Sequence, residues 1–123
     1  MVELVIMSAD AKRKENETRR ILKQMEEEAH EAMRPMRVEN LTVQVFNLAK
    51  SRIEVSTFDY CEILITDGEI RKWGWPADDE LMEAIERVRL LLSVAGYQCD
   101  DWYEYSKSWH TRSGKVGYLY VHW

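Results

Sequence analysis

The chain has 123 residues, of which 46% are hydrophobic and 32% charged, and this composition suits one globular domain over residues 1–123 and excludes general disorder. No apolar run approaches the roughly 20 residues of a membrane-spanning helix, and residues 2–7 are too short for a signal-peptide core of about 7–15 residues. The formal net charge of −5 argues against broad nonspecific binding to nucleic acid. We therefore expect a cytoplasmic protein without a membrane partner.

Residues 2–7 predict a short strand or an extended lead-in, and a helix is expected over about residues 9–34. Ser8 or Asp10 can cap this helix, and Pro35 is expected to end it. Its apolar residues recur every three or four positions, which places them on one face: Ile21, Leu22, Met25, Ala29, Ala32 and Met33.

The charges of this helix oppose its macrodipole. Six bases lie toward its N-terminus, namely Lys12, Arg13, Lys14, Arg19, Arg20 and Lys23. Four acids lie toward its C-terminus, namely Glu26, Glu27, Glu28 and Glu31. Pairs four residues apart, such as Glu15 with Arg19, offset part of this cost. Two interpretations follow: a solvated face with internal ion pairs, or charges that face a partner.

The middle of the chain has the alternating pattern of a β meander. It predicts four antiparallel strands near residues 41–48, 52–58, 60–66 and 69–74. The Asp67-Gly68 step between the last two is typical of a type I′ hairpin turn, which needs positive φ at both central residues.

The clearest helix pattern follows Pro76 and Asp78. Its apolar stripe has helical spacing and consists of Leu81, Ala84, Ile85, Val88, Leu91, Leu92 and Ala95. Gly96 is placed to adopt the left-handed conformation that ends many helices.

The pattern of the C-terminal residues predicts two strands, over residues 99–106 and 116–123. A polar loop at residues 110–115 lies between them. The whole order favours an α+β fold, an antiparallel sheet of about five to six strands with two helices packed mainly on one face. Cys61 and Cys99 form no C-x-x-C motif, and we interpret them as two small hydrophobic residues on strands.

Aromatic residues are concentrated near the C-terminus, in a number too large for one small core. Acids lie among them, and together they predict a partner-binding surface made of Asp100, Asp101, Trp102, Tyr103, Glu104, Tyr105 and Trp109. Acidic and aromatic groups suit a protein partner with a basic groove. The alternative is cross-strand aromatic packing beside a charged strand edge.

Two other functions stay open. A nucleic-acid-binding accessory protein would use the basic helix with Arg112, that is Lys12, Arg13, Lys14, Arg19, Arg20, Lys23 and Arg112. A small hydrolase or metal enzyme would use Asp101, His110 and His122, although nothing in their spacing requires a site. No nucleophile elbow, phosphate-binding loop or zinc-helix motif is present, so we predict no catalytic residue, no metal and no cofactor.

These features favour a small non-enzymatic protein-binding module or inhibitor with a larger protein partner. In compactness, acidity and lack of catalytic motifs the chain is similar to the inhibitors carried by phages and mobile elements, including anti-CRISPR and immunity-type proteins. The six methionines and the aromatic surplus also allow a homodimer.

Overall fold

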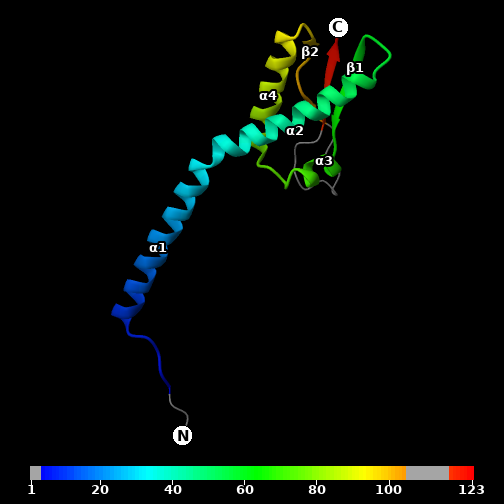
Figure 1. The fold of residues 1–123 in the computed structure, drawn as a ribbon. Helices are drawn as coiled ribbons and strands as arrows, with labels where there is room; N and C mark the ends of the chain where they lie inside the picture. The colour runs from blue at the N-terminus through cyan, green and yellow to red at the C-terminus, as the bar shows by residue number, and fades with distance from the viewer. Residues whose placement is uncertain (1–3, 105–116) are drawn as a thin grey trace. The chain divides into compact units, whose positions relative to one another are not determined.

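The computed structural model describes residues 4–104 and 117–123, whose contacts form two compact units that divide after Arg34. The helices are α1 (Ala9–Ala32), α2 (Arg34–Val55), α3 (Asp67–Lys72) and α4 (Asp78–Val94), and the strands are β1 (Tyr60–Ile65), β2 (Gln98–Cys99), β3 (Tyr103–Glu104) and β4 (Gly117–His122) (Figure 1). The α+β class is confirmed, with more helix than expected. That residues 1–123 make one domain stays a prediction.

The first predicted helix is confirmed as α1. Ser8 is its N-cap, and the Ser8 side chain accepts a hydrogen bond of 3.2 Å from the backbone N–H of Ala11. None of the α1 side chains is buried. Pro35 follows in the first turn of α2, where its missing N–H removes no helical hydrogen bond. Residues 4–7 are in neither a helix nor a strand.

The strands predicted near 41–48 and 52–58 are wrong, because α2 covers residues 34–55. Its buried residues recur every three or four positions, as one face of a helix requires: Val38, Leu41, Thr42, Val45 and Ala49. The apparent alternation of Leu41, Val43 and Val45 does not mark a buried strand face, since the Val43 side chain is 53% exposed.

The predicted hairpin at Asp67-Gly68 and the strand over 69–74 are also wrong. Thr66 is the extended N-cap of α3, and Asp67 and Glu69 lie in its first turn. The Thr66 side chain makes no capping hydrogen bond, but the acids in the first turn interact favourably with the helix dipole. The buried Ile70 anchors this short helix to the core.

The second predicted helix is confirmed as α4. Asp78, Asp79 and Glu80 occupy its first turn, and Gly96 follows it with a φ of +97°. This left-handed conformation is available to glycine without a Cβ clash. Within the described residues, no helix combines the length and apolar character needed to span a membrane.

Within residues 4–104 and 117–123, the antiparallel sheet is three strands wide, whereas five to six strands were predicted. β4 is central and pairs with β1 on one side, and β2 and β3 pair with it as two short successive segments on the other side. The strands predicted at 60–66 and 116–123 are confirmed as β1 and β4, whereas the strand predicted at 99–106 is replaced in part by β2 and β3. Residues 100–102, which are not assigned to a strand, separate these two segments, and residues 105–106 of the predicted strand lie outside the described residues.

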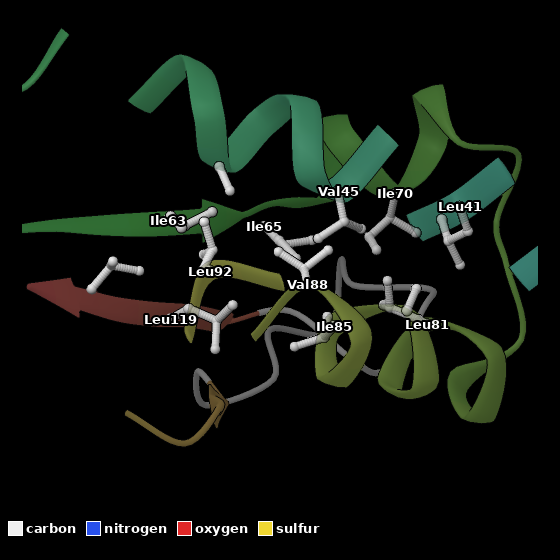
Figure 2. Close-up of a cluster of buried hydrophobic side chains, with 13 residues drawn as sticks. Leu41, Val45, Ile63, Ile65, Ile70, Leu81, Ile85, Val88, Leu92 and Leu119 are labelled. Atoms are coloured by element: carbon white, nitrogen blue, oxygen red, sulfur yellow. The ribbon is translucent and has the colours of Figure 1, made fainter. Parts of the chain in front are cut away.

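The core of the second unit lies on one face of this sheet. Ile63 and Ile65 of β1 and Leu119 and Val121 of β4 are fully buried there. Figure 2 shows side chains from α2, β1, α3, α4 and β4 pointing toward one another. The strand residues that alternate with these four point to the opposite face of the sheet.

Candidate protein-binding face

The strand alternation places a second set of side chains on the face away from the core. We call this set the outer face and define it as Tyr60, Glu62, Tyr103, Tyr118, Tyr120 and His122. The register pairs Tyr60 with His122 and Glu62 with Tyr120 across β1 and β4. Tyr103 of β3 lies opposite Tyr118. Because residues directly opposite in an antiparallel pair share a face, these side chains form one surface.

Aromatic rings on the outer face stack across the strands. The ring centroids of Tyr103 and Tyr118 are 5.2 Å apart with an interplanar angle of 25°. Those of Tyr60 and Tyr120 are 5.8 Å apart at 21°, and Phe58 stacks on Tyr60 at 5.6 Å. Such pairs stabilise the sheet by about 0.5–1.5 kcal/mol each beyond area burial. They still leave Tyr60 47% and Tyr103 44% exposed, so ring surface remains for a partner.

A cavity of about 230 Å³ opens on this face between Glu62, Asp100, Tyr103, Tyr118 and Tyr120. The backbone N–H of Asp100 donates a 2.9 Å hydrogen bond to the Tyr120 carbonyl oxygen, which fixes Asp100 beside the stacked rings. Glu62 and Asp100 are exposed, and neither has an ion pair within residues 4–104 and 117–123. Tyrosine walls with two carboxylates favour a cationic group, through ring quadrupoles and direct charge attraction.

The structure brings together two residues of the predicted binding surface and separates others. Asp100 and Tyr103 line the cavity. Asp101 instead forms an ion pair with Arg89 at 3.2 Å, and Trp102 packs half-buried against the core. Glu104 belongs to β3, but its side chain lies outside the described part, as do residues Tyr105 and Trp109.

Five residues of the outer face were not in the predicted surface: Tyr60, Glu62, Tyr118, Tyr120 and His122. Their signal in the sequence is the period-two alternation within residues 60–65 and 117–122, where residues facing the core alternate with residues that face away from it. That alternation gives the face of each strand residue. The alternation does not show which strands are neighbours. The tyrosines lie together because β1 and β3 both pair with β4.

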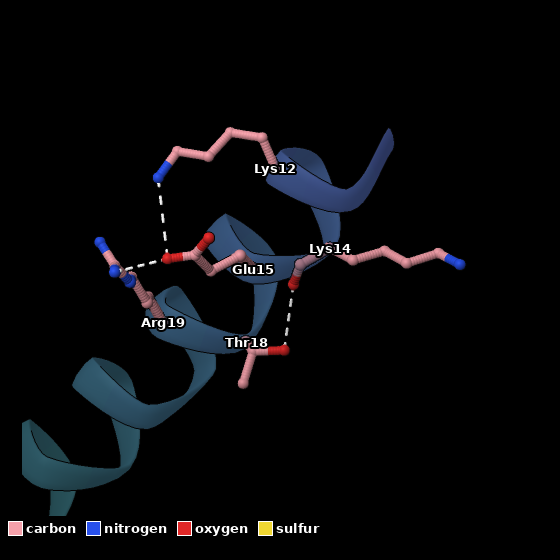
Figure 3. A network of polar contacts seen from close by, with 5 residues as sticks. All are labelled: Lys12, Lys14, Glu15, Thr18 and Arg19. Carbon is pink, nitrogen blue, oxygen red and sulfur yellow. Dashed lines mark hydrogen bonds and ion pairs between the residues drawn. The ribbon is translucent and has the colours of Figure 1, made fainter. Parts of the chain in front are cut away.

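The basic residues of the nucleic-acid alternative lie on α1, except Arg112, which is outside the described residues. Figure 3 shows Lys12 and Arg19 both reaching Glu15, at 3.8 and 2.5 Å, so part of the positive charge is neutralised within the helix. The Thr18 hydroxyl donates to the carbonyl oxygen of Lys14 at 3.0 Å. The predicted internal ion pairing of this helix is therefore confirmed for Glu15 with Arg19.

The residues of the enzyme alternative are not assembled by the described structure. His110 lies outside it, Asp101 binds Arg89, and the His122 ring is 5.7 Å from that of Tyr120. Residues 4–104 and 117–123 contain no group of three or more His, Cys, Asp or Glu side chains placed to hold a metal.

The two cysteines are free thiols on strands, as the sequence predicted. Cys61 of β1 and Cys99 of β2 both lie opposite Val121, one on each side of β4, and pack against the core. Burial raises the pKa of both thiols above their ordinary value of 9.0. Arg89 acts on the pKa of Cys99 in the opposite direction without cancelling that effect.

No protein-family model matches this sequence, and no similar curated protein or solved structure was found. The functional argument therefore depends on the geometry of the outer face.

Proposed function

We propose that this protein is a protein-binding module whose outer face receives a basic segment of a larger protein. The observation that carries the proposal is the 230 Å³ cavity with three tyrosine walls and the carboxylates of Glu62 and Asp100. An arginine side chain fits this chemistry, because its planar guanidinium stacks on aromatic rings and also pairs with carboxylates.

Charge favours a protein partner over nucleic acid at this face. Single-stranded nucleic acids also stack on aromatic side chains, but proteins that bind them combine the rings with a positively charged groove. Here the charges beside Tyr103 and Tyr120 are negative, so a phosphate backbone would be repelled. A basic peptide segment instead gains about 0.5–1 kcal/mol for each exposed cation–π contact.

The first test is a titration with a synthetic peptide of seven arginines, followed by amide chemical shifts. We expect shifts at β1, β3 and β4, and at least a tenfold weaker affinity when Glu62→Gln and Asp100→Asn are combined, because both carboxylates are lost from the cavity. The matched control is Glu39→Gln with Glu54→Gln, which removes two exposed charges from α2 and should leave the affinity within about twofold.

Equal affinity in both double variants, or shifts confined to other elements, would contradict the proposal. Tyr103→Ala extends the test to a natural partner, captured from cell lysate with nuclease at low and high salt. A stoichiometric protein held by the wild-type chain and lost with Tyr103→Ala supports it. Recovery of nucleic acid that disappears at high salt would instead favour the basic half of α1.

A further inference from the structure

Helix α1 has an apolar stripe that its own unit does not cover. The side chains of Ile21, Leu22, Met25 and Met33 are 49–60% exposed, and the helix of 24 residues buries none of its side chains. A helix in water gains most of its stability from packing of its apolar face rather than from propensity. The stripe therefore needs a covering surface.

The spacing of the stripe is that of a helix–helix seam. Leu22, Met25, Ala29 and Ala32 follow one another at intervals of three, four and three residues, the a and d positions of two heptads. Ala29 and Ala32 are small, so a second helix can approach closely on that side. The seam is two heptads long, which favours a reversible contact over a permanent one.

The charges of α1 divide the helix into a positive half and a negative half. Residues 9–23 contain six bases and three acids, a net charge of +3, whereas residues 24–33 contain four acids and no Lys or Arg, a net charge of −4. Two such helices side by side repel when parallel. When antiparallel, each positive half lies along the other's negative half, which also supplies acids near each helix N-terminus.

We propose that α1 pairs antiparallel with α1 of a second copy of this chain. In the register that lays each positive half along the other copy's negative half, Leu22 packs on Met25 of the second copy at the centre of the contact, and Arg19 lies beside Glu26 of the second copy. The same patch serves both copies, so the contact is a closed two-fold interface. The arrangement of bases in the N-terminal half and acids in the C-terminal half opposes the dipole of a single α1 helix. The same arrangement stabilises the antiparallel pair of α1 helices.

The association is tested on the full chain by sedimentation equilibrium over 1–200 µM. We expect a dimer that becomes at least tenfold weaker with Met25→Glu, which places a carboxylate twice at the centre of the seam. The matched control is Gln24→Glu, which adds the same charge to the negative half of α1 outside the stripe and should not weaken the dimer. Circular dichroism of each variant shows whether the helix persists. A monomer at 200 µM, or a dimer indifferent to Met25→Glu, overturns the proposal.

Orientation is tested by a spin label at Lys12→Cys in a chain that also carries Cys61→Ala and Cys99→Ala. In the antiparallel register, the Lys12 positions of the two copies lie at opposite ends of the helix pair. The labels are then about 23 residues, or roughly 35 Å, apart along the axis. A parallel pair would hold them side by side, within about 20 Å, and such a distance overturns the proposal.

Discussion

At the residue scale, Gly117 determines how closely β3 approaches β4. A Cβ at this position would lie 2.0 Å from the carbonyl oxygen of Tyr103 and 2.9 Å from a ring carbon of Trp102. No side chain fits there unless the backbone of β3 moves. Because Tyr103 carries the stack on Tyr118, this glycine sets the geometry of the outer face.

We expect Gly117→Ala to lower the free energy of unfolding by about 1–3 kcal/mol, as overpacking a tight site does, and to weaken binding of the arginine peptide. Urea unfolding and the peptide titration measure the two effects. The control is Gly68→Ala in α3, where the nearest atom to the new Cβ is the Thr66 hydroxyl oxygen at an ordinary 3.6 Å. If both variants behave alike, the close approach at Gly117 is not a constraint.

At the scale of elements, an ion pair between Arg37 and Glu80 joins α2 to α4. Arg37 donates a 2.8 Å hydrogen bond from Nε to Glu80 Oε1, and the Glu80 residue is only 8% exposed. Glu80 also lies in the first turn of α4, where the helix dipole favours an acid. The pair thus fixes the start of α4 against the long helix α2.

Glu80→Ala should destabilise the chain by about 1–3 kcal/mol, because it removes a partly buried, charge-assisted hydrogen bond. The exposed pair of Lys50 and Glu54, 3.8 Å apart within α2, provides the control. Glu54→Ala should change stability by less than about 0.5 kcal/mol, as is usual for surface pairs. Denaturant unfolding of both variants compares them, and a Glu80→Ala effect as small as that of Glu54→Ala would show that the Arg37–Glu80 pair does not stabilise the chain.

At the scale of the whole molecule, the half-buried thiols link stability to pH. Burial raises the pKa of Cys61 and Cys99 in the folded chain above 9.0, so the folded chain holds these protons at a pH where the unfolded chain has lost them. The stabilising contribution is complete below pH 9 and is lost as the pH rises through the folded pKa values.

We therefore expect the free energy of unfolding to fall between pH 9 and pH 11 more steeply in the wild-type chain than in a Cys61→Ala, Cys99→Ala double variant. Subtraction of the two pH profiles, measured by urea unfolding, removes the common contribution of lysines and tyrosines. Parallel profiles would mean that the thiols titrate alike in the folded and unfolded chains.

Much of the fold was predictable where local chemistry and packing agree. The Ser8 cap, the acids at the start of α4 and Gly96 at its end are local signals, and both helices formed where these signals lie. The alternation that defines β1 and β4 was read correctly for the same reason. In residues 41–58, β-branched residues matched both a strand and a helix pattern, and propensity alone could not separate the two.

Sequence patterns alone were enough to predict the α+β class, the charge division of α1 and two of the strands. The helix over residues 41–55 could be assigned only from the folded chain, because burial of Val38, Leu41 and Val45 on one side is a property of the packed core. The tertiary structure also decided the site. Glu62 and Tyr103 are far apart in the chain and reach one cavity because β1 and β3 both pair with β4, and strand neighbours are set by the contacts of the folded chain rather than by any local pattern.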